Sequence, residues 1–193
     1  QGRGYFGIDV PTSVLYRASE PEKPSEPEKP PEPKKQGGLV GLGLTLNGYL
    51  DDEQGLYCPG DDSTSPTEEL AKIRDRSGSA GSSYFYRQRV PGSAGVLDNL
   101  GSMADNLEAT ALAMDTNSLL TGVDNGFRTN HGNKSVNVVF TDGHVSRYRN
   151  SDNTTDGVFS IRDSDFADFP DSVKDRLQQI FVNADYAAET GDA

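Results

Sequence analysis

Both histidines of this 193-residue chain lie in one stretch, HGNKSVNVVFTDGHV, which spans residues 131–145. His131, Asp142 and His144 carry imidazole and carboxylate groups, which bind zinc or transfer protons in catalytic sites. A zinc site normally uses three or four protein ligands, and Cys58 is the other soft ligand of the chain. Nucleophile motifs such as G-x-S-x-G are absent from the sequence. The stretch therefore favours a structural interpretation over a metal or catalytic site.

In this structural interpretation, Asp142 and Gly143 turn the chain between two strands. His144 is then an exposed cross-strand neighbour, and His131 forms a hydrogen bond with a nearby loop. Val136, Val138 and Phe140 occupy every second position of the first strand and therefore share one face. Because Asp-Gly is a preferred two-residue type I′ turn, we expect Phe140 to pair with Val145. Val145 should then join this apolar face, whereas His144, Val139, Ser146 and Tyr148 should line the other.

A second pattern could bind a cation. The stretch DNTTDGVFSIRD has the spacing of a twelve-residue calcium loop, with oxygen-bearing side chains at positions 1, 3, 5 and 12: Asp152, Thr154, Asp156 and Asp163. It departs from the motif in having Thr at position 3 and Asp in place of Glu at position 12, and strands rather than helices are expected around it. Calcium is therefore a hypothesis here, with a Kd on the order of 10⁻⁴–10⁻³ M.

Composition excludes several classes of function. The formal charge is −12, from 30 acidic and 18 basic residues, which does not suit binding to nucleic-acid phosphates. No run of 18 apolar residues exists that could span a membrane. A single cysteine, Cys58, rules out an internal disulfide framework, so it is a buried thiol or pairs with a cysteine outside the chain. The stretch GLGLTL lacks the third glycine of the dinucleotide-binding fingerprint and the GK[ST] of a P-loop, so it does not indicate nucleotide binding.

Sequence patterns predict an α+β fold. Ser65, Pro66 and Glu68 form a helix start, and Gly78 can end that helix. A second helix is expected after Pro170, with an apolar stripe made of Val173, Leu177, Ile180 and Ala184. The apolar residues of 39–50 should pack under the sheet, and further strands are expected at 55–58 (GLYC), 82–90, 110–115 and 157–161.

The chain divides into four parts. Residues 20–38 repeat the unit EPEKP and contain many prolines, so we expect an extended polyproline II segment. This segment is either a stiff linker or insertion, which the nearly balanced Glu and Lys residues favour, or a ligand for a proline-binding groove. It separates an N-terminal segment (1–19) from a globular head (39–187). A flexible tail follows at 188–193.

The order of these motifs resembles a known family. LGLTLNGYLDDEQGLYCPGD, SSYFYRQR, ALAMDT and NHGNKSVNVVFTDGHV are similar to the bacterial prepilin-type, pseudopilin-like proteins with a C-terminal His…Asp-Gly motif that are abundant in planctomycetes and their relatives. The resemblance covers roughly residues 39–149, and its most specific parts are YCPGD and VNVVFTDGHV. Ten residues lie between His131 and Asp142, one more than is usual in the family, which predicts a bulge or a shifted register.

The resemblance implies a pilin-like head in which an antiparallel sheet with a C-terminal hairpin packs against an N-terminal hydrophobic helix. That helix, which would be the only membrane contact, is expected to be absent from this chain. The resemblance further implies an exported structural subunit of a type II secretion pseudopilus or a type IV pilus-like filament, in the periplasm or on the cell surface. Its partners would be other pilin or pseudopilin subunits and the assembly machinery, and it would not be an enzyme. Two alternatives are a calcium-dependent cell-surface binding module and a small metal-dependent hydrolase using His131, Asp142 and His144.

Overall fold

The computed structural model describes residues 12–17, 38–39, 41–61, 63–87, 100–102, 106–121, 127–150, 157–166 and 171–191. Within these ranges antiparallel strands combine with two α-helices, so the fold is of the predicted α+β class. The main sheet has the order β2-β1-β3-β4-β7-β8, and all of its pairings are antiparallel. Its strands are β1 (Thr12–Arg17), β2 (Gly38–Leu39), β3 (Ala80–Tyr86), β4 (Ala111–Asp115), β7 (Ser135–Phe140) and β8 (Val145–Arg149).

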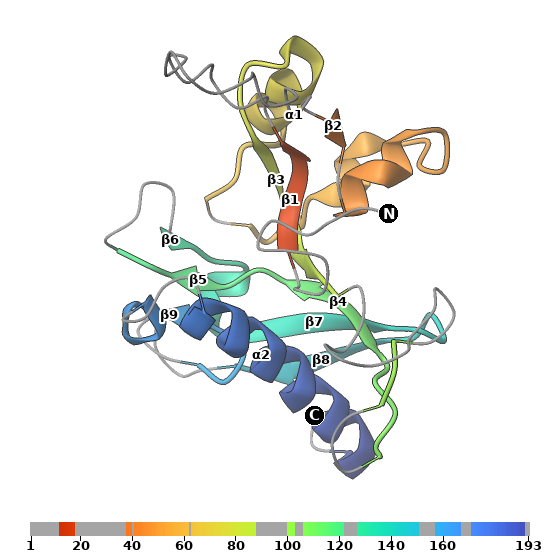
Figure 1. Cartoon of the computed structure of the whole chain (residues 1–193), viewed down its shortest axis with the longest axis vertical. Helices are drawn as coiled ribbons and strands as arrows, with labels where there is room; N and C mark the ends of the chain where they lie inside the picture. The colour runs from red at the N-terminus through yellow and green to blue at the C-terminus, as the bar shows by residue number, and fades with distance from the viewer. Residues whose placement is uncertain are drawn as a thin grey trace, which may run out of the picture.

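The remaining elements surround this sheet. A small mixed sheet has the order β6-β5-β9 and contains β5 (Ser118–Leu119), β6 (Phe127–Arg128) and β9 (Ile161–Arg162). Helix α2 (Asp171–Thr190) crosses β4, β7 and β8, whereas α1 (Pro66–Asp75) lies with β1 and β2 at the far end of β3 (Figure 1). Four short 3₁₀ helices are η1 (Gly41–Leu46), η2 (Glu53–Leu56), η3 (His131–Asn133) and η4 (Asp163–Phe166).

Residues 12–17, which the sequence assigns to a separate N-terminal segment, form β1 within the main sheet. β1 pairs with β3 on one side and with β2 on the other, where Tyr16 lies opposite Leu39. Residues 18–37, which include most of the Pro-rich stretch, lie outside the described ranges. Their two flanking strands are paired, so the ends of this connection are held next to each other.

Deleting residues 20–35 is therefore expected to leave the stability of the head unchanged or to raise it by up to about 1.4 kcal/mol. The deletion leaves a four-residue connection, and each halving of loop length lowers the entropy cost of closure by about 0.6 kcal/mol. Urea denaturation of both proteins measures the difference. A loss of more than about 2 kcal/mol would show that this segment packs on the head, because such a loss exceeds typical loop effects.

The main core lies between α2 and the sheet. The predicted stripe of α2 is buried as expected, and it packs with Phe181 against Met114, Val136, Val138, Phe140 and Tyr148. The helix continues to Thr190, so the residues from 188 to 190, predicted as a flexible tail, are helical. This extension lengthens the contact with the sheet, because Ala187 and Ala188 pack against the same core.

A second, smaller core surrounds α1. Ser65 Oγ accepts a hydrogen bond from Glu68 N at 3.4 Å and Pro66 is the first helical residue, as predicted. The helix ends at Asp75 with Arg76 as its C-cap, in the left-handed conformation (φ 54°), rather than at Gly78. Leu70 packs with Leu56 and Tyr57 and is surrounded by Leu42, Leu46, Leu50 and Ile73. The apolar residues of 39–50 therefore pack with α1 instead of the main core, and the predicted strand at 55–58 is replaced by η2 and a loop.

The β7–β8 hairpin forms, but its predicted register is wrong by one residue. Val139 lies opposite Val145 and Val136 opposite Tyr148. A shift of one residue exchanges the two faces of a strand. Consequently Tyr148 is buried in the core, whereas Val145 is 61% exposed on the opposite face.

The cause is the turn. Phe140 N donates to His144 O, so the loop has three residues and Gly143 alone among them has a positive φ, of 88°. This is a turn followed by a bulge glycine, not a type I′ turn. The longer loop allows the large Tyr148 ring to be buried in place of Val145. The irregularity predicted from the His131–Asp142 spacing occurs instead in the β4–β7 pairing, between Ala111 and Ala113.

Replacing Gly143 by valine is expected to destabilise the head by about 1–3 kcal/mol, because a β-branched side chain resists a positive φ. Nothing lies within 4 Å of the added Cβ, so the effect would report backbone strain and not a clash. His144→Ala is the control, since His144 is half exposed and its loss should change stability by no more than about 0.5 kcal/mol. Equal effects of the two substitutions in thermal melts would contradict this account of the turn.

The strand predicted at 157–161 is largely wrong. The residues from 158 to 159 form a turn, and only Ile161 continues into the two-residue β9. Phe159 and Ile161 are nevertheless buried in the main core. Their apolar character reflects burial of a loop rather than strand pairing.

Candidate functional site

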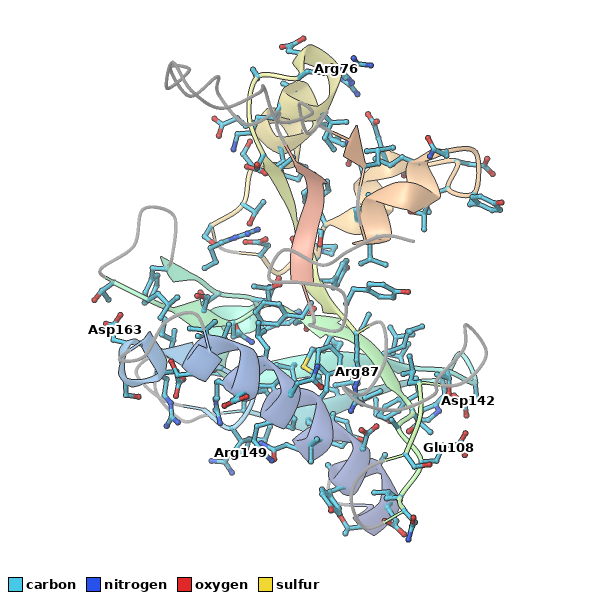
Figure 2. The ribbon with its side chains drawn as sticks, viewed as in Figure 1. Arg76, Arg87, Glu108, Asp142, Arg149 and Asp163 are labelled. Atoms are coloured by element: carbon cyan, nitrogen blue, oxygen red, sulfur yellow. The ribbon has the colours of Figure 1, made fainter. Side chains whose placement is uncertain are left out.

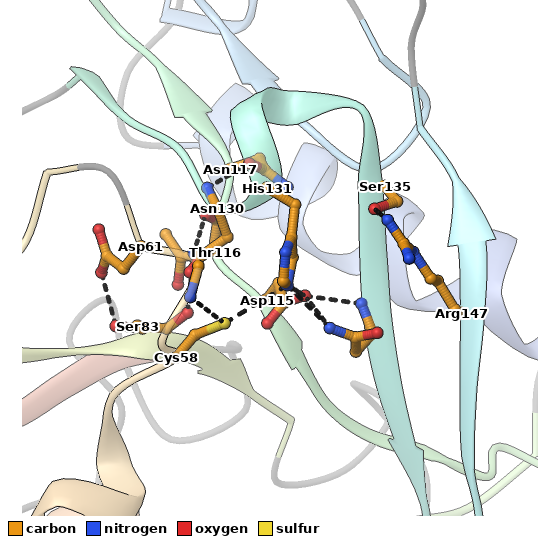
Figure 3. A network of polar contacts seen from close by, with 12 residues as sticks. Cys58, Asp61, Ser83, Asp115, Thr116, Asn117, Asn130, His131, Ser135 and Arg147 are labelled. Atoms are coloured by element: carbon orange, nitrogen blue, oxygen red, sulfur yellow. Dashed lines mark hydrogen bonds and ion pairs between the residues drawn. The ribbon is translucent and has the colours of Figure 1, made fainter.

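Three side chains with metal-binding or nucleophilic chemistry converge on one side of the main sheet. His131 Nε2 lies 3.4 Å from Cys58 Sγ and 3.3 Å from Asp115 Oδ2. Figure 3 shows the three groups turned toward one another. Both the thiol and the carboxylate approach the same imidazole nitrogen. A nucleophile–histidine–carboxylate relay uses the two different ring nitrogens, so this arrangement is not a catalytic triad.

Three separate elements supply these residues. Cys58 follows η2, Asp115 ends β4 and His131 begins η3. The Asp115 side chain is fully buried and Cys58 is 8% exposed, while 27% of the His131 side chain is accessible. Cys58 and Asp115 are therefore largely shielded from solvent, whereas solvent reaches the imidazole of His131.

The loop after Cys58 is packed directly against His131. His131 N donates to Gly60 O at 2.8 Å, and Asp61 forms an isolated bridge with Asn130. The Asp61 carboxylate stabilises the loop by accepting bonds from Ser63 N and Thr64 N, each at 2.8 Å. A Cβ at Gly60 would lie 2.5 Å from the imidazole of His131. Glycine is therefore required here because the ring occupies the space of a side chain.

His131 sits in a strained backbone segment. His131, Gly132 and Asn133 have φ values of 52°, 60° and 61°, all in the left-handed region. A non-glycine residue in this region costs on the order of 1–3 kcal/mol and is frequent at functional sites. The side chains of Asn150 and Ser160 hold Asn133 in place, through bonds of 2.8 and 2.7 Å to its Oδ1. This network stabilises the turn that presents His131 to Cys58.

The electrostatics of the site are dominated by Asp115. Its Oδ2 accepts bonds from Asn137 N at 2.7 Å and Asn137 Nδ2 at 2.9 Å, but no described residue donates to its buried Oδ1. Burial raises the pKa of Asp115, against the hydrogen bonds of Asn137. Burial also raises the pKa of the Cys58 thiol, and the nearby Asp115 carboxylate raises it further. Burial thus favours the protonated forms of both acidic groups of the site and raises the pKa of each.

A pocket of about 680 Å³ opens beside these groups. Cys58, Asp115, His131 and Asn137 form its polar wall. The other lining side chains are mostly apolar and include Leu42, Tyr49, Leu50, Met114, Val139 and Val145. Tyr84 also lines it, and burial raises the pKa of its phenol to about 12, so it is a neutral hydrogen-bonding group at neutral pH.

The structure separates the residues that the sequence groups together. Asp142 and His144 pair with each other at the exposed tip of the hairpin, with Asp142 Oδ1 2.6 Å from His144 Nδ1 (Figure 2). The His144 ring stacks on Phe140. Of the three residues suggested for a metal or hydrolase site, only His131 belongs to the cluster of possible metal ligands found among the described residues.

The predicted calcium loop lies mostly outside the described residues, since Asp152, Thr154 and Asp156 belong to the undescribed range 151–156. Asp163 is described, and its carboxylate accepts bonds from Thr121 N at 2.9 Å and Thr121 Oγ1 at 2.6 Å. Calcium binding at this loop stays a prediction.

Sequence patterns identify two of the three clustered residues, and they miss Asp115. Cys58 is recognisable as a soft ligand and His131 as a possible one. Asp115 appears only as the last residue of an apolar strand, ALAMD. A carboxylate that directly follows buried strand residues is itself a signal, because a buried charge needs a partner.

Comparisons with protein-family models, with curated proteins and with solved structures found no match to this chain. In the part of the chain that is described, neither α-helix has the length and apolar character needed to cross a bilayer.

Proposed function

We propose that this chain is the globular head of a pseudopilin-like subunit that assembles into a type II secretion pseudopilus or a type IV pilus-like filament. One observation supports the proposal most. The two stretches that carry the resemblance, YCPGD and the His…Asp-Gly segment, fold against each other through Cys58, Gly60 and His131. Sequence parts that are specific to a family and far apart in the chain are expected to meet when they serve one structural purpose.

The arrangement of one helix packed on an antiparallel sheet is consistent with this role. An antiparallel sheet is covered on one face by a long helix, although that helix is the C-terminal α2. On the opposite face, Tyr49 (87% exposed) and Val145 (61% exposed) leave apolar surface accessible beside the pocket. Exposed apolar patches of this kind mark contact surfaces between proteins. They would meet neighbouring heads in a filament.

The experiment is performed in cells that produce the full gene product. Immunogold labelling and Western blots of sheared surface filaments should detect the head, and deletion of the prepilin peptidase gene should abolish that signal. Tyr49→Ser combined with Val145→Ser should reduce the filament signal several-fold without changing the amount of folded head. Phe127→Ser combined with Val158→Ser is the matched control, because both residues are about half exposed and neither lines the pocket. A surface signal independent of the peptidase would contradict the proposal.

A further inference from the structure

We propose that Cys58, Asp115 and His131 form a zinc site with one open coordination position that faces the pocket. The ligand atoms already have suitable spacing. A tetrahedral ion with bonds of about 2.0–2.3 Å places neighbouring ligand atoms about 3.4–3.6 Å apart. The Sγ–Nε2 and Oδ2–Nε2 distances are 3.4 and 3.3 Å. The three ligand atoms all lie within 4.8 Å of one another. An ion would displace the 2.9 Å contact between Asn137 Nδ2 and His131 Nε2 and draw the three side chains together.

The donor set selects the metal. One thiolate, one imidazole and one carboxylate are all ligands that zinc accepts, whereas a carboxylate disfavours copper(I) and a thiolate disfavours calcium or magnesium. Charge agrees with this assignment. Zn²⁺ bound to a Cys58 thiolate, an Asp115 carboxylate and neutral His131 gives a site of net charge zero. On binding, the S–H bond of Cys58 breaks and its proton leaves to solvent.

The protein around the three ligands restricts their movement. Asn137 N holds the Asp115 carboxylate, Gly60 N donates to Cys58 Sγ at 3.3 Å, and the left-handed turn fixes His131. The Oδ2 atom used for the distances above also accepts from Asn137, whereas Asp115 Oδ1 is buried and receives no hydrogen bond from any described residue, so the carboxylate keeps one acceptor oxygen free for an ion. All three ligands line the pocket, so a water molecule on the fourth position would face its apolar interior.

The test uses the full chain, stripped of metal with a chelator and then given one equivalent of zinc. After gel filtration, elemental analysis should find one zinc per chain. Zinc at 100 times its Kd should raise the melting temperature by about 5–10 °C. Cobalt(II) in place of zinc should produce a sulfur-to-metal charge-transfer absorption in the near ultraviolet, because a thiolate is a ligand. Bound cobalt without that absorption would overturn the proposal, and this measurement requires no variant.

Variants then locate the ion. Cys58→Ser and His131→Gln should each weaken zinc binding by at least about 100-fold, more than the loss of an outer-shell partner. His144→Gln and Asp142→Asn, at the exposed tip of the β7–β8 hairpin, are matched controls and should bind zinc like the wild type. Zinc stabilisation that survives Cys58→Ser but is lost in Asp156→Ala would place the ion in the 152–163 loop and overturn the proposal.

A glycine pair tests the geometry without removing any ligand. Gly60→Ala inserts a Cβ 2.5 Å from the imidazole and should weaken zinc binding at least tenfold by displacing His131. Gly78→Ala is its control, because nothing lies within 4 Å of the added atom. Far-ultraviolet circular dichroism confirms that each variant is folded. Equal zinc affinity in the two glycine variants would overturn the assignment of His131 as a ligand.

Discussion

Replacing Asp185 by alanine is expected to lower the free energy of unfolding by about 3–5 kcal/mol, because it leaves a buried guanidinium without its counter-ion. Arg87 and Asp185 are both fully buried, with Arg87 Nη1 2.6 Å from Asp185 Oδ2. Arg87 lies at the end of β3 and Asp185 on α2, so the pair joins the sheet to the helix that covers it (Figure 2). Urea denaturation of the wild type and the variant measures the loss.

Asp185 has a second role that adds to the effect. Its Oδ1 accepts bonds from Thr110 N at 2.8 Å and Ala111 N at 2.7 Å, at the start of β4. Alanine therefore also leaves the buried Ala111 amide and the partly buried Thr110 amide without this acceptor, and this loss is part of the expected total of about 3–5 kcal/mol. The carboxylate thus compensates a charge and completes the hydrogen bonding of a strand.

Two further variants make this prediction specific. Asp175→Ala changes an exposed aspartate of the same helix and should alter stability by no more than about 0.5 kcal/mol. The double variant Arg87→Met with Asp185→Asn removes both charges and keeps an acceptor for β4, so it should recover most of the loss. A loss below 1 kcal/mol in Asp185→Ala would mean that Arg87 finds another partner or water.

Sequence patterns predict the elements whose signals are local. The N-cap at Ser65 and the apolar stripe of α2 depend on neighbouring residues, and both are confirmed. The strand β4 forms within its predicted range, and β3 overlaps its predicted range but begins two residues earlier and ends at Tyr86, because apolar and aromatic residues there are bounded by polar stretches. Such signals do not depend on knowing the partner of each element.

The register of the hairpin could not be obtained in this way. Asp142-Gly143 is compatible with both a two-residue and a three-residue loop, which differ by one residue in pairing. The choice depends on whether Tyr148 or Val145 is buried against α2. That preference is decided by packing with a helix more than twenty residues further along the chain, and the local pattern contains no information about it.

The candidate site is hard to predict for a related reason. Cys58, Asp115 and His131 come from three elements, and their meeting requires the pairing of β4 with β7 and a left-handed turn at a histidine. A positive φ is uncommon at any non-glycine residue, although histidine and asparagine adopt it more often than most, so the sequence of this turn permits the left-handed conformation without requiring it. The buried asparagines that hold it are polar residues, which sequence patterns assign to the surface.

Asn150 is the centre of that buried network, and Asn150→Ala is expected to destabilise the head by about 2–4 kcal/mol, the cost of leaving buried partners unpaired. The two hydrogens of its Nδ2 are shared among three acceptors, Asn133 O, Asn133 Oδ1 and Ser160 Oγ, at 2.8–3.0 Å, and its Oδ1 accepts from Phe159 N at 2.8 Å. Alanine removes all four bonds. The Phe159 amide and the Asn133 carbonyl then lose these partners inside the protein.

The same substitution should also change the site, because Asn150 stabilises the left-handed turn that begins at His131. With this turn loosened, His131 should move away from Cys58, and a neutral thiol reagent should modify Cys58 several-fold faster than in the wild type. Asn47→Ala, at an exposed asparagine, is the control for both measurements and should match the wild type. Destabilisation without faster modification of Cys58 would show that the network supports the core alone, and that the position of His131 is determined by the 58–61 loop.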